Sequence, residues 1–377
     1  MSLSSHPSRA HGSLRHDQGF TMVELMVALV VSLLASVAIY SIFIQSEGQQ
    51  RRSNETADLW QQARIAMAML ERDVRMAGYG LGGNLGCQVV SYNANRTPPN
   101  IPAYTLMPIV SADPAPATPI SGPGGSDQLT ILYSTSANGG LPATQLNGDM
   151  PNSSAELIVA STAGFQEGDL VILNEPGKTC TLVQVTQVQQ AALKLQHNPG
   201  VSAPYNPAGG FSIFPASGYV AANGVTLYNM GSMVNNRYSI APNSTVAGQP
   251  DPTPTLMVTN VNTDTTTPVA RGIVSLQVLY GMDTNGDNAV DAYARPSGGG
   301  WFAANGGQIR TVRIALLARA SLPDRDYNSP ASITLLPAMG GNAAVVYNVP
   351  NTDRHFRHQL FVTEVPLRNP ILGNQTT

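Results

Sequence analysis

An acidic, asparagine-rich stretch late in the chain has the spacing of a calcium-binding loop. It reads Asp-Thr-Asn-Gly-Asp-Asn-Ala-Val-Asp from position 283 to position 291. Oxygen ligands occupy loop positions 1, 3, 5 and 9, and a backbone carbonyl can serve position 7, but Ala294 replaces the bidentate glutamate of position 12. The stretch predicts a weak calcium site, and the alternative is a hairpin turn stabilised by local hydrogen bonds. The candidate ligands are Asp283, Asn285, Asp287, Ala289 and Asp291.

The chain has only two cysteines, Cys87 and Cys180. In an oxidising compartment such a pair can form one disulfide across a long loop, which stabilises a fold by about 2 to 4 kcal/mol when the geometry fits. The sequence therefore predicts a Cys87–Cys180 disulfide in an exported protein. Two buried free thiols are the alternative.

Other residues that could do chemistry are few. His355 and His358 are three positions apart in an expected strand, where their side chains point to opposite faces, so they are a poor pair of metal ligands. No nucleophile elbow, Walker loop, His-Glu-x-x-His or Cys-x-x-Cys sequence occurs. Charged residues make up 11%, and no basic run with aromatic residues predicts nucleic-acid binding. We expect no enzymatic activity and no required cofactor, with a membrane-tethered enzyme as the weakest alternative.

One acidic residue, Glu24, lies inside a long apolar run. The run extends from Phe20 to Ile44, 25 residues, and at about 1.5 Å per residue it can cross a hydrocarbon core of roughly 30 Å. A carboxylate in a membrane helix costs roughly 2.5 to 3.5 kcal/mol, less towards the interface, so it usually has a partner or a function. The free N-terminal amine of a neighbouring subunit would be such a partner. The alternative is an ordinary single-pass anchor with its acid at the interface.

A short polar leader, residues 1–19, precedes this run. It carries Arg9 and Arg15 against a single acid, Asp17, so the positive-inside rule keeps it in the cytoplasm and sends the C-terminal bulk across the membrane. A secretory signal has its cleavage site after the apolar core, whereas this leader ends at Gly19, before the core. The sequence predicts one pass through a membrane and contact with membrane lipid.

The helical pattern continues beyond the apolar run. Apolar residues recur there at spacings of three and four, as in an amphipathic helix, and glycines at 78, 80, 82 and 83 end the pattern. We predict one helix from about Phe20 to about Ala77, with a membrane half at 20–44 and an amphipathic half at 45–77 that packs on a sheet. The apolar stripe consists of Leu59, Ala63, Met67, Leu70, Val74 and Ala77.

Residues 78–377 are expected to form a periplasmic, β-rich domain with long loops. Residues 94–125 are rich in Pro, Ala, Ser and Asn and predict a surface connection. A helix followed by many strands predicts the α+β class, with an antiparallel sheet packed on the helix. Strands are expected at 127–133, 156–160, 169–173, 180–188, 192–195, 255–259, 273–280, 308–320 and 355–366, with weaker candidates at 211–214, 225–228 and 237–240.

The stretch GFTMVELMVALVVSLLA, residues 19–35, resembles the class III signal of type IV pilins and of type II secretion pseudopilins. In those families a prepilin peptidase cuts after the glycine and methylates the new N-terminus. The resemblance therefore implies cleavage between Gly19 and Phe20 and N-methylation of Phe20. It also implies that Glu24, fifth in the mature chain, makes an assembly contact with a neighbouring helix.

Later blocks resemble the PilW-type minor pilins. They include Arg72-Asp-Val-Arg-Met-Ala-Gly-Tyr79, Val312-Arg-Ile-Ala-Leu-Leu-Ala-Arg319 and Val365-Pro-Leu-Arg-Asn369, besides the blocks GSDQLTILY, which ends at Tyr133, and GIVSLQVLYGMD, which ends at Asp283. The resemblance implies a pilin-like fold, anchored by a single pass through the inner membrane. The implied partners are other minor pilins, the major pilin and the inner-membrane assembly platform. The implied role is to prime pilus assembly and cap the pilus tip, which supports twitching and adhesion. A J-type pseudopilin of type II secretion is the first alternative, and an adhesive tip subunit is the second.

Overall fold

The computed structural model describes residues 21–81, 86–112, 120–121, 125–136, 144–153, 156–200, 202–208, 213–244, 253–296 and 301–369. The chain divides into two units, the first ending at Asn54 and the second beginning at Glu55. The predicted cleavage positions, Gly19 and Phe20, lie outside the described residues, as do residues 211 and 212 of one weak strand candidate.

Helix α1 begins at Met22 and ends at Met76, which confirms the predicted helix over the described residues. In the first unit its large apolar side chains from Met22 to Ile44 are all more than half exposed. Among the described helices it alone is long and apolar enough to cross a membrane, with a mean hydropathy of 2.6 in its most apolar window. The exposed surface is what a lipid-facing segment requires.

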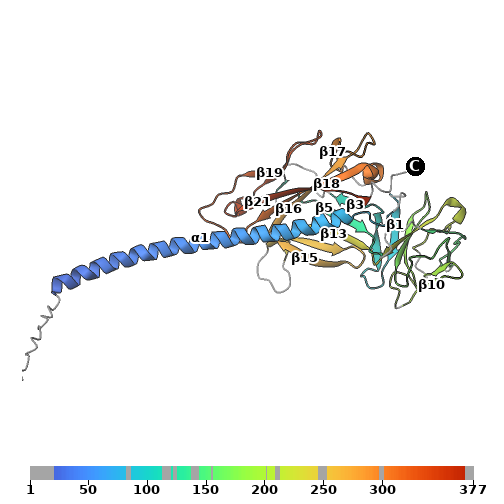
Figure 1. Ribbon diagram of the computed structural model, residues 1–377, viewed down its shortest axis with the longest axis horizontal. Coiled ribbons are helices and arrows are strands. Elements are labelled where there is room, and N and C mark those ends of the chain that lie inside the picture. Colours follow the sequence, from blue (N-terminus) through green and yellow to red (C-terminus); the bar gives the residue numbers. More distant parts are fainter. Residues whose placement is uncertain are drawn as a thin grey trace, which may run out of the picture. The chain divides into compact units, whose positions relative to one another are not determined.

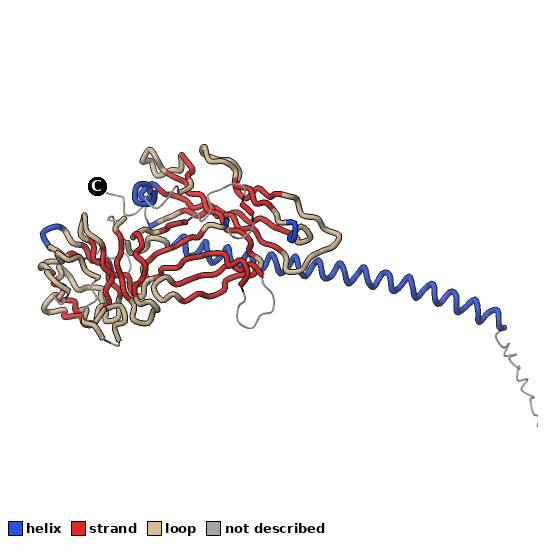
Figure 2. The backbone as a smooth tube through the Cα atoms, turned by 180° about the vertical axis from the view of Figure 1, so that it is seen from behind, coloured by secondary structure: helices blue, strands red, loops and turns tan. Residues whose placement is uncertain are grey.

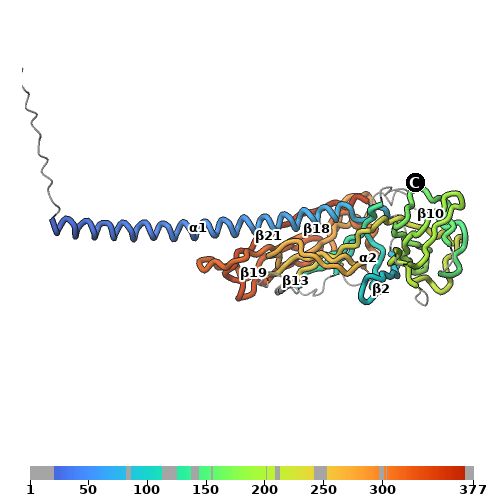
Figure 3. The backbone as a smooth tube through the Cα atoms, turned by 90° about the horizontal axis from the view of Figure 1, so that it is seen from below, coloured from blue at the N-terminus to red at the C-terminus, as the bar shows by residue number. Residues whose placement is uncertain are grey.

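From Glu55 onward α1 belongs to the second unit and buries one face. The buried side chains recur every three or four residues and contact strands from two antiparallel sheets (Figures 1 and 3). Several of them are alanines, which allow the helix backbone to approach the sheets closely. They are Leu59, Ala63, Ala66, Leu70, Val74 and Ala77.

The first of these two sheets has five antiparallel strands in the order β15-β14-β13-β5-β3. Side chains on the helix-facing side, such as Ile131 and Leu256, are fully buried. The strands are β3 (Ile109–Ala112), β5 (Gln128–Tyr133), β13 (Val234–Ser244), β14 (Thr253–Asn260) and β15 (Thr265–Arg271).

The second sheet has four antiparallel strands in the order β17-β16-β18-β21. Its far side is covered by a small sheet, β19-β20-β4, which has a separate apolar core around Tyr347. The strands are β16 (Ile273–Met282), β17 (Ala292–Ala294), β18 (Ile309–Arg319), β21 (His358–Pro366), β4 (Ile120–Ser121), β19 (Ser332–Leu336) and β20 (Val345–Asn348); the short helices are α2 (Trp301–Asn305), η3 (Gly306–Gln308) and η4 (Asn351–Asp353).

Residues 134–233, which we call the inserted module, leave the five-stranded sheet between β5 and β13 and return to it. Tyr133 and Val234 lie opposite each other, so the sheet continues as if the module were absent. Its strands, with β1 and β2, form sheets ordered β2-β1-β9-β8-β12-β6 and β10-β11-β7 around an apolar core of their own. Figure 2 shows these strands gathered at one end of the second unit. They are β1 (Gln88–Tyr92), β2 (Asn100–Thr105), β6 (Thr144–Gln145), β7 (Leu157–Ile158), β8 (Leu170–Asn174), β9 (Cys180–Gln184), β10 (Gln187–Gln189), β11 (Lys194–Gln196) and β12 (Thr226–Gly231), with η2 (Ala221–Asn223).

The prediction of a surface connection over 94–125 was wrong. That segment contains β2, β3 and β4, and Ile101, Leu106 and Ile109 are buried. Prolines interrupt the alternation of apolar and polar residues, which hid the strands. β2 and β3 lie at sheet edges, where proline is tolerated.

Other expected strands have different bounds in the structure: the one at 156–160 is shortened to β7, and the one at 192–195 is β11, from Lys194 to Gln196. The expected strand at 180–188 is two strands, β9 and β10, joined at Val185 and Thr186. The strand expected from His355 begins at His358, because residues 351–356 form η4 and a turn. The weak candidate at 237–240 lies within β13, and the one at 225–228 overlaps β12, which begins at Thr226. The described residues Ile213 and Phe214 are in no strand.

Candidate assembly site

The start of α1 is closed by reciprocal hydrogen bonds between Thr21 and Glu24. The Glu24 amide donates to Thr21 Oγ1 at 3.2 Å, and the Thr21 amide and hydroxyl donate to Glu24 Oε2 at 3.0 and 2.9 Å. This is a capping box, which satisfies backbone donors that a helix start leaves free. This role of Glu24 was not predicted, although the Thr-x-x-Glu spacing indicates it. Whether Glu24 also contacts a neighbouring subunit stays a prediction.

Three serines in the apolar half of α1 keep their hydroxyls inside the helix. Ser32, Ser36 and Ser41 donate to backbone carbonyls three or four residues earlier, at 2.7 to 2.9 Å. Because lipid offers no hydrogen-bond partner, this internal bonding lets the hydroxyls lie in a hydrocarbon layer.

Near the other end of α1, the fully buried Asp73 faces the five-stranded sheet. Its carboxylate accepts from Tyr238 Oη of β13 at 2.6 Å and from Tyr133 Oη of β5 at 3.3 Å. Asn236 adds a contact at 3.4 Å, and the Arg72 guanidinium lies 3.0 Å away. A buried carboxylate is stable only with such partners, so α1 fits the sheet in one register.

Both tyrosines are held as hydrogen-bond donors. Burial, together with the nearby Asp73 charge, raises the pKa of Tyr133 to about 12. The same two causes raise the pKa of Tyr238 well above its usual value. Their hydroxyls therefore stay protonated at any physiological pH, and Asp73 keeps its two donors.

The end of α1 is capped by a residue from the far end of the chain. Asn369 Nδ2 donates to the backbone carbonyls of Arg75, Met76 and Ala77 at 3.5, 3.2 and 3.0 Å. These carbonyls have no partner within the helix. The Met-Ala-Gly-Tyr and Leu-Arg-Asn blocks of the sequence therefore meet in space.

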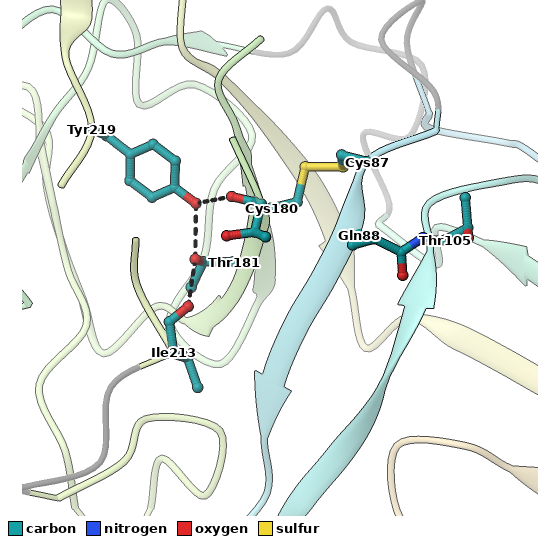
Figure 4. The surroundings of a disulfide bond; sticks show 8 residues. Cys87, Gln88, Thr105, Cys180, Thr181, Ile213 and Tyr219 are labelled. Atoms are coloured by element: carbon teal, nitrogen blue, oxygen red, sulfur yellow. Dashed lines mark hydrogen bonds between the residues drawn. A yellow bond between two sulfur atoms is a disulfide. The ribbon is translucent and has the colours of Figure 1, made fainter. Parts of the chain in front are cut away.

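The structure joins Cys87 to Cys180 in a disulfide with a Cα–Cα distance of 5.9 Å (Figure 4). It connects the residue before β1 to the first residue of β9, so it links the inserted module to the segment that follows α1. Beside it, Tyr219 Oη donates to Thr181 Oγ1 at 2.8 Å, and Thr181 Oγ1 donates to the Ile213 carbonyl at 2.9 Å (Figure 4). The closed loop spans 93 residues, for which the chain-entropy model gives about 4 to 5 kcal/mol.

In the predicted calcium loop, the Asp283 carboxylate is occupied by protein groups. It accepts from the amides of Gly286 and Asn288 at 2.6 and 3.0 Å, and Arg310 from β18 lies 2.8 Å away. Asp283 is buried, so the guanidinium supplies the positive charge that a calcium ion would bring.

The other predicted ligands also bond within the loop. Asp291 accepts from the amide and hydroxyl of Thr284, Asn285 accepts from the Asp287 amide, and Asp287 accepts from the Ala289 amide. The described residues contain no group of three or more His, Cys, Asp or Glu side chains that could hold a metal ion. The geometry favours the hairpin-turn alternative, and calcium binding stays a prediction.

Replacing Asp283 with Ala should lower the free energy of unfolding by about 2 to 3 kcal/mol, because Arg310 is then buried without its partner. Asp287→Ala is the matched control, since Asp287 is exposed in the same loop. Urea unfolding with and without calcium measures the stability that each variant loses and any stability that calcium adds. Equal stability of the two variants without calcium would contradict the Arg310 pairing. Because Asp287 is also a predicted ligand, a calcium stabilisation of the wild type that both variants lose would support a metal site.

His355 and His358 do not form a joint site. His355 is exposed, and its Nδ1 lies 2.9 Å from the Tyr327 carbonyl. His358 is partly buried, and its Nδ1 lies 3.0 Å from the Phe356 carbonyl and 3.1 Å from Ser329 Oγ. Each ring is therefore oriented by its own neighbours.

The fold should lose stability as pH falls from about 6.5 to about 4, because of His358. Burial lowers the pKa of His358 from 6.5 in the unfolded chain to about 4 in the folded chain. Between these two pH values the unfolded chain is protonated at His358 and the folded chain is not, so falling pH favours unfolding. The full shift corresponds to roughly 3 kcal/mol, less for partial exposure. Urea unfolding across this range should show a steeper pH dependence for the wild type than for His358→Gln. Parallel profiles would contradict this assignment.

Two family models match separate regions of the chain. The prokaryotic N-terminal methylation motif matches residues 14–40, and the type IV pilus-assembly protein W matches residues 237–369. The second match begins within β13 and ends at Asn369, so it covers strands of both sheets under α1 as well as the residue that caps α1. The inserted module lies outside both matches. No curated protein and no solved structure matches the chain.

Proposed function

We propose that this chain, a PilW-family type IV pilin anchored in the membrane by α1, is a minor pilin that joins other minor pilins to prime pilus assembly. The observation that supports the proposal most is that the two family matches fall on α1 and on the strands that pack against it. Of the two sheets that pack against the second half of α1, the PilW match covers every strand except β3, β5 and the first residues of β13. The methylation motif covers most of the first half of α1.

The proposed topology follows from the leader and the helix. Residues 1–19 stay in the cytoplasm until a prepilin peptidase removes them, and residues 55–377 lie in the periplasm. The major pilin and the inner-membrane assembly platform are the further partners. We assign the chain a role in pilus assembly without a catalytic step. We place it at the pilus tip, where it supports twitching and adhesion.

Deleting the gene should remove most surface pili and abolish twitching, because filament growth would lack its priming complex. Electron microscopy of surface pili and a twitching-zone assay measure the two effects. The control is the deletion strain carrying the wild-type gene on a plasmid. Normal pilus number in the deletion strain would refute the priming role, and pili that persist with defective secretion would favour the pseudopilin alternative.

A further inference from the structure

The side of α1 that faces away from the sheets is basic. Five exposed residues recur along it at spacings of three and four, so they share one face of the helix, which we call the outer face. Three are arginines and none is acidic. They are Gln61, Arg64, Ala68, Arg72 and Arg75.

Of the four acidic residues of α1 from Glu55 onward, three are buried or bonded to strands and loops of the second unit, and Asp58 is exposed. Glu55 accepts from the Ser321 hydroxyl at 2.6 Å, Glu71 accepts from the Thr363 hydroxyl at 2.8 Å, and Asp73 is buried. Asp58 precedes all three arginines. Arg72 and Arg75 contact Asp73 and Glu71, yet their side chains remain 65% and 55% exposed. The outer face therefore presents positive charge to solvent or to a binding partner.

The aromatic side chain of Trp60 lies beside Arg64 of the outer face. Trp60 is 38% exposed, and the Arg64 guanidinium lies 5.6 Å from the centre of its ring. On its other side Trp60 meets Phe361 of β21 edge-on at 4.9 Å, and the neighbouring Val362 is 43% exposed. Tryptophan and arginine are the residue types that contribute most to binding energy in protein interfaces.

We propose that the outer face, with Trp60 at its edge, docks an acidic surface of a different pilin subunit. Charge complementarity selects this partner, since a second copy docking through the same face would oppose three arginines with three arginines. Anionic lipid is the less suitable occupant, because lipid recognition uses clusters of four to eight basic residues next to a membrane segment, and this face has three, spread along the helix. The inference rests on the proposed function, and it adds that α1 selects unlike neighbours.

Cross-linking in cells tests the proposal. A photoreactive p-benzoylphenylalanine at position 68, in the middle of the outer face, should give an adduct with another pilin, identified by mass spectrometry. Arg64→Glu combined with Arg75→Glu should reduce the adduct at least tenfold. Arg325→Glu, a reversal at another exposed arginine of the second unit, should leave the yield unchanged. Thermal unfolding of each purified full-length variant checks that the fold is intact.

The outcomes separate the alternatives. An adduct between two copies of this chain, an adduct with lipid alone, or no adduct would overturn the proposal. So would a pilin adduct of unchanged yield after the double charge reversal in a correctly folded chain. Failure of the proposed function is a separate result, since it is detected by normal piliation in the deletion strain whatever the cross-linking shows.

Discussion

Replacing Gly19 with Ala is expected to leave the precursor uncut and to remove the chain from assembled pili. The resemblance of residues 19–35 to the class III signal predicts that a prepilin peptidase cuts after this glycine. Without the cut, the amine of Phe20 stays in a peptide bond and cannot pair with a neighbour's Glu24. The polar leader also remains attached to the helix, where its charges resist entry into a packed filament core.

The measurement is the mass of the N-terminal peptide from membranes of cells that express each variant. The wild type should begin at methylated Phe20, and the Gly19→Ala chain should retain residues 1–19. Gly48→Ala is the matched control, because Gly48 lies in α1 with open space around its Cα and an alanine fits there. Normal processing of the Gly19→Ala chain would refute the cleavage assignment.

Local sequence patterns predicted the parts of the fold that depend on local contacts. The spacing of Leu59, Ala63 and Leu70 predicted both the second half of α1 and its buried face, which the structure confirms. Strongly apolar strands such as β16 and β18 were also predicted, since burial on both faces leaves a continuous apolar run. The short edge strands β2 and β3 were missed, because prolines and few buried residues give them little pattern.

Pairing between distant segments could not be predicted in this way. β5 and β13 are hydrogen-bonded neighbours although the whole inserted module lies between them in the sequence. No local pattern of apolar and polar residues indicates that the chain comes back to the same sheet after the module. The calcium loop shows the same limit. Its oxygen-rich spacing was visible, but the cation that contacts Asp283 is Arg310 from a different strand. Likewise, the tyrosine partners of Asp73 are 60 and 165 residues away, so the sequence showed only an acid in an apolar stripe.

Replacing Asp73 with Ala is expected to lower the free energy of unfolding of the second unit by about 3 to 5 kcal/mol. The change leaves the hydroxyls of Tyr133 and Tyr238 buried without an acceptor, and it removes the partner of Arg72. It also removes the contact that selects one register of α1 on the five-stranded sheet. The effect should therefore include a less uniquely positioned helix as well as a less stable fold.

Two further variants separate charge from hydrogen bonding. Asp73→Asn keeps a side-chain oxygen that can accept from Tyr238, so it should cost less than Asp73→Ala. Tyr238→Phe removes the shorter bond, 2.6 Å, and should cost about 1.5 to 3 kcal/mol, as for other hydrogen bonds to a charged group. Urea unfolding followed by tyrosine fluorescence measures all three. If Asp73→Ala were as stable as the wild type, the buried carboxylate would not fix α1, and packing of the alanine and leucine face would have to set the register alone.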